Sequence, residues 1–186
     1  MKLSITKRAT TRKSETLNVR RVGNVPAIIY GNGAEPEQVI VNGPEFAALL
    51  RTVQQGRLST TQIELAYEGK TFKALIKDIQ YHPTSYIPTH IDLMKLEDSL
   101  KVRVKVPMEY VGAAECPGIK LGGFLRSVLR VVPVECDSPK LIPSHFELSV
   151  AELGMRQSKR VKDIKFPNGV RPLAPVEEVA VVIAKR

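Results

Sequence analysis

The chain has 186 residues, 43% hydrophobic and 25% charged, a composition of folded globular proteins that excludes wholesale disorder. Its longest apolar run, residues 179–184, is far shorter than the about 20 residues that span a membrane, and no leader sequence is visible. We therefore expect a cytoplasmic protein. Two cysteines are too few for a disulfide framework or a structural zinc site. The formal net charge of +9 favours an anionic partner.

The first 95 residues predict a mainly β unit. Leu3 and Ile5 alternate with polar residues, which indicates a strand. A helix is predicted with Ser14 as its N-cap and Gly23 at its end. The following elements are strands at 27–30 and 39–41, a helix at 44–50, a hairpin of strands 63–67 and 72–80 around Glu68-Gly69, and a strand at 90–96. Five or six short strands with two small helices predict a closed or nearly closed β-barrel.

A second β-rich unit is predicted from residue 96 onward. Residues 101–106 alternate strictly between basic and apolar side chains, so one face of this strand is expected to be buried. Glycines and prolines separate the other predicted elements, which are strands at 124–128, 131–136, 146–150 and 179–183 and a single helical turn at 151–154.

Catalysis is not expected from these residues. The chain lacks a phosphate-binding loop, a dinucleotide fingerprint and a nucleophile elbow. Two prolines separate His82 from His90, so these histidines cannot share a helix face as zinc ligands. A dyad of Cys116 with a histidine stays open, but we expect Cys116 to lie in a turn, without a helix N-terminus to activate it. Cys116 and Cys136 are interpreted as packing residues, and we expect no cofactor, metal or small-molecule substrate.

Positive charge is concentrated at the start of the chain. Residues 1–30 contain seven basic and one acidic side chain, whereas residues 31–94 have a net charge of −2. This pattern indicates a face directed at a polyanion, although a solvated N-terminus explains the charge equally well. RNA suits a barrel with loop arginines better than DNA, because no helix-turn-helix or zinc finger is present. Tyr30 either stacks on a base or packs in the core.

Three blocks of sequence, in order, carry a resemblance to a known family. The first is Arg20-Arg21-x-Gly23 followed by residues 25–31, V-P-A-I-I-Y-G. The second joins residues 76–83, I-K-D-I-Q-Y-H-P, to residues 90–92, H-I-D. The third is residues 118–123, G-I-K-L-G-G, with Ile142-Pro143. Together they resemble the family of bacterial large-subunit ribosomal protein number twenty-five, which binds 5S rRNA, in the long two-domain form called general stress protein CTC.

The resemblance implies a six-stranded β-barrel domain at residues 1–95 that binds 5S rRNA in the central protuberance of the large (50S) subunit. It implies two or three short helices in that domain and a second, β-rich domain at residues 96–186. The implied partners are 5S rRNA and neighbouring large-subunit proteins, and the implied location is on the ribosome. The resemblance favours an RNA-facing Tyr30. Carried over by position, the implied RNA contacts are Arg8, Lys13, Arg20, Tyr30, Gln80 and His90, with Asp92 nearby. Arg12, Arg21 and Lys77 are added as contributors.

The basic segment departs from the family pattern. Family members usually read G-K-G-A-A-R-R-L-R where residues 12–20 of this chain read R-K-S-E-T-L-N-V-R. Leu17 and Asn18 thus stand in place of two arginines, and Glu15 adds an acid. Two lost phosphate contacts of about 1–2 kcal/mol each weaken binding by about ten- to a thousandfold, which Arg12 is expected to offset in part. The alternative function is a stress-related protein that acts mainly through protein partners and binds RNA weakly.

A second group of basic residues lies near the C-terminus. It allows two interpretations, a contact with ribosomal RNA or protein and a solvated loop, of which the loop is favoured because the charges form no clear face. Its members are Arg156, Lys159, Arg160, Lys162 and Lys165.

Overall fold

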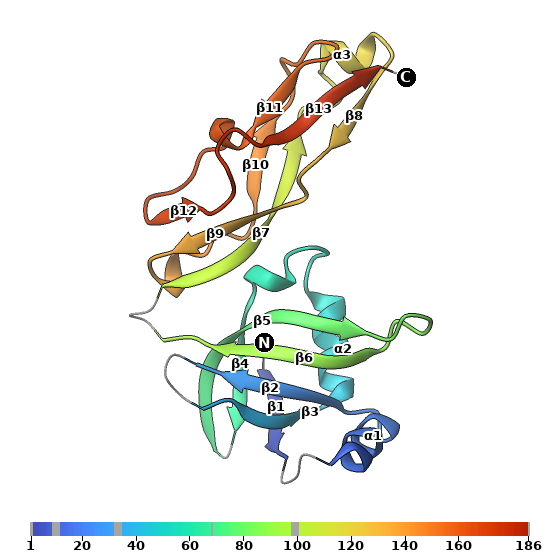
Figure 1. Ribbon diagram of the computed structural model, residues 1–186, viewed down its shortest axis with the longest axis vertical. Helices are drawn as coiled ribbons and strands as arrows, with labels where there is room; N and C mark the ends of the chain where they lie inside the picture. The colour runs from blue at the N-terminus through green and yellow to red at the C-terminus, as the bar shows by residue number, and fades with distance from the viewer. Residues whose placement is uncertain (1, 9–11, 32–34, 68, 98–100, 186) are drawn as a thin grey trace. The chain divides into compact units, whose positions relative to one another are not determined.

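The computed structural model describes residues 2–8, 12–31, 35–67, 69–97 and 101–185 (Figure 1). The chain divides into two compact units, residues 1–100 and 101–186. The predicted boundary between residues 95 and 96 stays a prediction. The first unit contains β1 (Lys2–Lys7), α1 (Lys13–Arg21), β2 (Val25–Tyr30), β3 (Glu37–Val41), α2 (Gly43–Thr52), η1 (Leu58–Thr60), β4 (Gln62–Tyr67), β5 (Lys70–Tyr81) and β6 (Pro88–Lys95).

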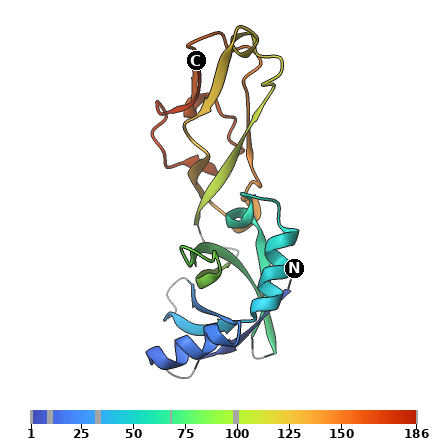
Figure 2. The ribbon, with the colours of Figure 1, turned by 90° about the vertical axis from the view of Figure 1, so that its right-hand side faces the viewer.

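The six strands of the first unit form a closed barrel in the order β1-β3-β2-β6-β5-β4. The β1–β4 and β2–β6 pairs are parallel, and the other pairs are antiparallel. Alternate strand residues point inward and are buried, as Leu3 and Ile5 illustrate. Phe46 and Leu49 of α2, which lies against the barrel (Figure 2), complete this core. The predicted six-stranded barrel is confirmed.

The helix α1 differs from its prediction at the start and agrees at the end. It begins at Lys13, so its N-cap is Arg12, whose side chain makes no capping hydrogen bond, and the predicted N-cap Ser14 lies inside the first turn. Ser14 cannot accept a bond from the helix start at that position, because an N-cap residue precedes the first helical residue. Gly23 follows the helix with φ of +86°, a left-handed conformation that favours glycine.

The helix α2 is anchored at both its cap and its first turn. Asn42 is its N-cap, and the side-chain oxygen of Asn42 accepts a hydrogen bond of 3.2 Å from the Glu45 amide. The Glu45 carboxylate in turn accepts a bond of 2.7 Å from the Ser4 amide of β1.

The predicted hairpin is present as β4 and β5, with Gly69 at φ of +78°, and Glu68 lies outside the described residues. No helix in the described parts of the chain is long and apolar enough to cross a membrane.

The second unit is rich in β-strands, which form two sheets. The predicted β-rich fold class of this unit is therefore confirmed. Its sheets have the strand orders β10-β7-β9-β12 and β11-β13-β8. The predicted alternation of β7 is confirmed, with Val104 and Val106 buried and Lys105 exposed. The elements are β7 (Val102–Val111), α3 (Pro117–Lys120), β8 (Gly123–Ser127), β9 (Val131–Cys136), η2 (Pro139–Leu141), β10 (Phe146–Ser149), β11 (Ser158–Arg160), η3 (Val161–Asp163), β12 (Val170–Pro172) and β13 (Val179–Lys185).

Three local expectations for the second unit were wrong. Residues 151–154 form a turn closed by the bond from the Leu153 amide to the Val150 carbonyl, not a helical turn. Cys116 is the N-cap of the short helix α3, where no helix was expected. Residues 156–165 are not a loop throughout, because they contain η3 and β11, in which Lys159 pairs with Val181 of β13. The expected solvation of this segment agrees with the exposure of most of its basic side chains. The interpretation of Cys116 as a packing residue agrees with its full burial and its Sγ bond of 3.0 Å to the Leu153 carbonyl.

Tyr110 of β7 joins separate segments of the second unit, and its loss is expected to destabilise that unit. Its hydroxyl donates toward the carbonyls of Leu129 and Ala180, the latter at 2.8 Å. Tyr110→Phe leaves these acceptors without that donor, so we expect the free energy of unfolding to fall by about 1–3 kcal/mol. Urea unfolding followed by circular dichroism measures this change. Tyr86→Phe, at a side chain that is 77% exposed, is the control and is expected to change stability by less than about 0.5 kcal/mol.

Tyr110 also makes the stability of the protein depend on pH. Burial raises the pKa of the Tyr110 phenol above its ordinary value of 10.0. The folded state therefore holds this proton more tightly than the unfolded state, so its contribution is complete below pH 10 and is lost as the pH rises through the folded-state pKa. We expect Tyr110→Phe to lose less stability than the parent protein above pH 10. An equal alkaline loss in both proteins would contradict this expectation.

Candidate nucleic-acid interface

The outer surface of β2, β6 and β5 brings four predicted site residues together. Ile91 of β6 points into the core, so His90 and Asp92 on either side of it lie on the outside of the barrel. Gln80 of β5 is paired with His90 across the sheet. Tyr30 of β2, which pairs with β6 in parallel, points to the same side because the residue before it is buried. We call Tyr30, Gln80, His90 and Asp92 the outer barrel face.

Hydrogen bonds and nearby carboxylates set the chemistry of the outer barrel face. The Nδ1 atom of His90 lies 2.9 Å from Oδ1 of Asp92, so the carboxylate orients the imidazole ring. Asp78 of β5 is paired with Asp92. Burial raises the pKa of the Tyr30 phenol, and the negative charges of Asp92 and Asp78 raise it further. Tyr30 is therefore a neutral hydrogen-bond donor at neutral pH, and it lies on the same face as an imidazole and an amide, groups whose chemistry allows hydrogen bonds to base edges and hydroxyls.

Lys77 lies at an irregularity of β5 that the sequence does not reveal. The pairing of β5 with β6 runs from Ile76 opposite Leu93 directly to Asp78 opposite Asp92, so Lys77 is an extra residue in a bulge. A bulge re-aims the side chains that follow it. Without this bulge, Asp78 would share the inward orientation of Ile76, because strand side chains alternate. The bulge therefore places Asp78 on the outside of the barrel, with Gln80 beyond it.

The basic residues of α1 share its exposed face. Val19 is the buried residue of the helix, and it faces the barrel. Lys13, Arg20 and Arg21 are exposed, and at 100° per residue they lie within a single arc on the opposite side of the helix. Leu17, with 44% of its surface exposed, lies at the centre of that arc. We call Lys13, Arg20 and Arg21 the basic helix face.

Arg20 also connects α1 to the outer barrel face. Its Nε and Nη2 atoms donate bonds of 3.0 Å and 2.8 Å to the Thr89 carbonyl in β6. The Thr89 hydroxyl donates a bond of 3.1 Å to the Gln80 carbonyl in β5. These bonds hold the basic helix face next to the strand ends that carry Gln80 and His90. The structure therefore joins the two groups of predicted residues into one continuous region.

Arg8 is half-buried and is held by hydrogen bonds within the barrel unit. Its Nη1 atom donates a bond of 2.9 Å to the Thr16 hydroxyl of α1, and its Nη2 atom donates to the Gln38 side chain of β3. Its Nε atom is buried without a hydrogen-bond partner. Arg8 thus positions α1 on the barrel. Arg12 is exposed at the start of α1, close to the basic helix face.

The loop between β5 and β6 adds a feature that the sequence analysis missed. Tyr86 and Ile87 are 77% and 62% exposed, and Tyr86 has a left-handed φ of 53°. A groove of about 210 Å³ beside this loop is lined by Ile87, His82 and Arg20. The signal in the sequence is an apolar Tyr-Ile pair between two prolines, in a loop where polar residues are usual.

No group of His, Cys, Asp or Glu in the described ranges is arranged to hold a metal ion.

Comparisons with known proteins find sequence similarity along both units of the chain. The sequence model of the ribosomal L25p family matches residues 3–93, and that of the ribosomal protein TL5 C-terminal domain matches residues 101–186. Proteins named large ribosomal subunit protein bL25 from Chlamydia abortus, Chlamydia caviae and Chlamydia pneumoniae are 42%, 39% and 38% identical to the chain. Each alignment covers 100% of both proteins. The chain therefore belongs to the ribosomal L25p family, in the two-domain form that ends with a TL5 C-terminal domain.

Proposed function

We propose that the chain binds 5S rRNA in the central protuberance of the large ribosomal subunit, through the basic helix face and the outer barrel face. Membership of the family makes the chain a structural protein of the large subunit, with ribosomal RNA and ribosomal proteins as partners, and not an enzyme. As a ribosomal protein it is cytoplasmic and ribosome-associated. The observation that carries the proposal is the Arg20–Thr89–Gln80 connection, which unites the two faces.

The two faces supply different contacts to an RNA helix. Arginine and lysine on the basic helix face neutralise phosphates and fix the register of the protein on the RNA. Tyr30 offers a ring for stacking, and Gln80 and His90 offer hydrogen bonds to base edges or 2′-hydroxyls. Asp92 orients the His90 ring through the 2.9 Å contact. Arg12 and Lys77 contribute positive charge, and Arg8 acts by positioning α1.

Binding of the full-length chain to 5S rRNA and to a size-matched control RNA, measured across a salt series, tests this proposal. We expect selective binding to 5S rRNA with a steep dependence on salt, because released counterions drive the phosphate contacts. Equal, weak binding to both RNAs would contradict the proposal. Sucrose gradients give a second test, since absence from the 50S fraction under growth and stress alike would favour the alternative of a stress protein with protein partners.

Arg20→Ala is expected to weaken 5S rRNA binding by about tenfold and to lower the salt slope by somewhat less than one unit. The substitution removes a phosphate contact and the bonds from α1 to Thr89. Arg20→Lys separates these effects, because lysine retains the positive charge but cannot donate the pair of hydrogen bonds that the guanidinium makes to the Thr89 carbonyl. The Arg20→Lys variant is expected to keep the parent salt slope while losing part of the affinity.

Arg51→Ala is the matched control for Arg20→Ala, since Arg51 is likewise an exposed arginine in the last turn of a helix, α2, and belongs to neither face. We expect it to leave affinity and salt slope unchanged. If Arg20→Ala behaves in the same way as Arg51→Ala, Arg20 is not an RNA contact.

A further inference from the structure

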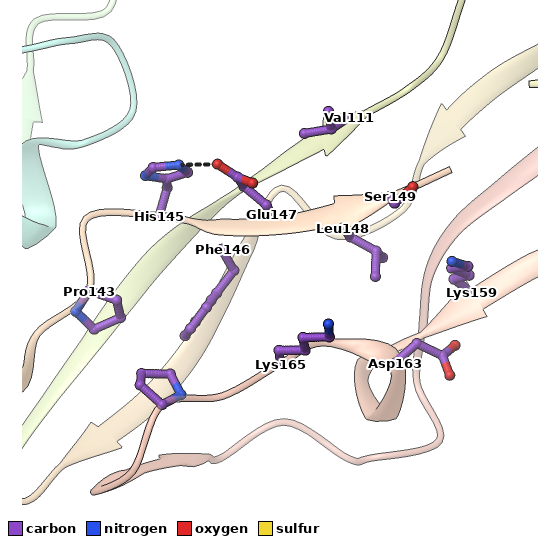
Figure 3. A pocket seen from close by; sticks show the side chains of 11 residues that line it. Val111, Pro143, His145, Phe146, Glu147, Leu148, Ser149, Lys159, Asp163 and Lys165 are labelled. Carbon is purple, nitrogen blue, oxygen red and sulfur yellow. Dashed lines mark hydrogen bonds and ion pairs between the residues drawn. The ribbon is translucent and has the colours of Figure 1, made fainter. Parts of the chain in front are cut away.

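The grooves of the two units differ in the charges that line them. In the second unit, a groove of about 740 Å³ is lined by residues of β10 and β11 and of the segments that follow these strands. Its walls carry two lysines and two carboxylates (Figure 3), which are Lys159, Lys165, Glu147 and Asp163. Its charge therefore selects no single class of ligand. The groove of about 210 Å³ in the first unit is different, because no carboxylate is among the described residues that line it.

This smaller groove presents hydrogen-bond donors. The Nδ1 atom of His82 accepts a bond of 3.4 Å from the Ser85 amide, which places the ring proton on Nε2. The side-chain oxygen of Asn24 accepts a bond of 3.2 Å from a backbone amide, so its NH₂ group remains for a ligand. Arg20 bonds to the Thr89 carbonyl through Nε and Nη2 and retains its Nη1 donors. A ligand rich in acceptor atoms suits this set of side chains.

The loop between β5 and β6 has a defined shape beside the groove. The His82 amide donates a bond of 2.9 Å to the Ile87 carbonyl, and the Tyr86 amide donates a bond of 2.9 Å to the His82 carbonyl. The Thr84 hydroxyl lies 3.1 Å from Nδ1 of His82. The loop projects beyond the strands of the barrel (Figure 1). A hydrogen-bonded turn thus presents the side chains of this loop to a partner.

Tyr86 has two properties that folding alone does not favour. Its φ of 53° is left-handed, a conformation in which bulky side chains are rare and which glycine or asparagine adopts at lower cost. Its side chain is 77% exposed, so it contributes little to the core. Strained residues are concentrated at sites of binding, where the conformation serves the function. Tyr86 lies at the rim of the groove, between the lining residues Ser85 and Ile87, which is consistent with a contact residue.

The surroundings of Tyr86 favour a nucleotide as its partner. A tyrosine ring is a stacking surface for any base. The donors of the groove match the acceptor atoms of bases, 2′-hydroxyls and phosphates. The groove is also continuous with the proposed RNA interface, because Arg20 belongs to both. A protein segment would meet the same donors with its carbonyl groups, but it would compete with the RNA for Arg20.

We propose that Tyr86 and this groove bind one unpaired nucleotide of the ribosomal RNA, with the base stacked on the Tyr86 ring and acceptor atoms bound by Arg20, Asn24 and His82. This inference rests on the proposed function, to whose interface it adds a nucleotide-binding site. Ile87, which is 62% exposed, supplies apolar contact with the base. Bases inside a double helix present no free face, so the site selects a bulged or looped-out nucleotide.

Tyr86→Asn is expected to weaken binding of the full-length chain to 5S rRNA by at least about fivefold, because it removes the stacking ring. Asparagine tolerates the left-handed conformation, so the circular dichroism spectrum is expected to stay unchanged. The salt slope is expected to keep the parent value, since no charge is lost. An unchanged slope distinguishes the loss of stacking from the loss of a phosphate contact in Arg20→Ala.

Two controls accompany this variant. Tyr86→Phe keeps the ring and is expected to retain the parent affinity. Leu121→Asn removes an apolar side chain that is 71% exposed in the second unit, and it is expected to leave the affinity unchanged. The second control shows whether any loss of exposed apolar surface weakens binding.

Tyr86→Trp makes the contact visible, because the chain contains no tryptophan of its own. Stacking on a base is expected to quench the emission of this indole when 5S rRNA is added to the full-length variant. Hexaadenylate RNA and an abasic hexamer with the same ribose–phosphate backbone serve as probes at low salt. We expect the first to quench the emission and the second to leave it unchanged. A hexaglutamate peptide tests an acidic protein segment and is expected to cause no quenching.

Equal 5S rRNA affinity of Tyr86→Asn and the parent chain would overturn the proposal. If this variant were also depleted from the 50S fraction of sucrose gradients, the loop would be assigned to a ribosomal protein instead. Equal quenching by the abasic hexamer and hexaadenylate would show that no base is bound. In these cases the parent chain still binds 5S rRNA selectively, whereas failure of the proposed function appears as equal binding of the parent chain to 5S rRNA and the control RNA.

Discussion

Leu17→Arg combined with Asn18→Arg is expected to tighten binding to 5S rRNA by about ten- to a thousandfold. Leu17 lies at the centre of the exposed arc of α1, between the side chains of the basic helix face, and Asn18 is exposed beside it. Two added arginines would each gain a phosphate contact of about 1–2 kcal/mol. Neither residue supports the barrel core, which α1 meets through Val19. Folding is therefore expected to persist in the variant.

The salt dependence distinguishes phosphate contacts from other causes of tighter binding. Two new contacts are expected to steepen the slope of log affinity against log salt by about 1.4 to 1.8 units. Leu17→Gln with Asn18→Gln is the matched control, because it removes the exposed leucine without adding charge. An equal gain in the glutamine variant, or an unchanged slope in the arginine variant, would remove positions 17 and 18 from the proposed interface.

Gly43→Ala is expected to destabilise the barrel by about 3 kcal/mol or more. A Cβ atom at this position would lie 1.7 Å from the carbonyl oxygen of Gly23 and 2.9 Å from its carbonyl carbon. Both obstacles are backbone atoms, so no side chain is able to rotate away, and the start of α2 and the segment after α1 must separate. That movement would also strain the 3.2 Å bond from the Gly43 amide to the Asn24 side chain.

Urea unfolding monitored by circular dichroism measures the effect of Gly43→Ala. Gly31→Ala is the control, since among the described residues a Cβ there would meet only the Lys95 side chain, at an ordinary contact distance of 3.5 Å. We expect the control to change stability by less than about 0.5 kcal/mol. Equal unfolding midpoints for the two alanine variants would show that the close approach of Gly43 to Gly23 does not affect the free energy of unfolding.

The close approach of Gly43 to Gly23 connects the stability of the barrel to the proposed interface. Gly23 comes just after Val22, the C-cap of α1, and Arg20 in the last turn of that helix is hydrogen-bonded to Thr89. A displaced Gly23 is expected to shift the basic helix face relative to Gln80 and His90, so a partly folded Gly43→Ala protein should lose 5S rRNA affinity as well. In this region, the packing that maintains the barrel also maintains the alignment of the two faces.

Most secondary structure followed from local sequence patterns. Alternation predicted β1 and β7, and glycine and proline positions predicted the end of α1 and the hairpin of β4 and β5, because these signals depend only on neighbouring residues. The boundaries of α1 and α2 were less accurate. The Glu45 amide donates a hydrogen bond to Asn42, so α2 begins before the predicted start. The carboxylate of the same Glu45 accepts a tertiary hydrogen bond from the Ser4 amide of β1.

The candidate site was predicted from the sequence as a set of residue types, chiefly through family resemblance. Positive charge between residues 1 and 30 indicated an anionic partner, but charge alone did not distinguish an interface from a solvated terminus. The sequence also did not separate Arg20, which is exposed, from Arg8, whose guanidinium is held by Thr16 and Gln38. Burial and hydrogen bonding of an arginine depend on residues distant in the chain.

By itself, then, the sequence determined the β-rich class, the basic character of the N-terminal segment and the substitution of two family arginines at Leu17 and Asn18, because these are properties of composition and local order. Only the tertiary structure decided the strand order that closes the barrel, the bulge at Lys77 and the union of both faces through Thr89. It also decided that β10 and β11 border one groove. Each of these depends on pairing between strands far apart in sequence, which local periodicity does not specify.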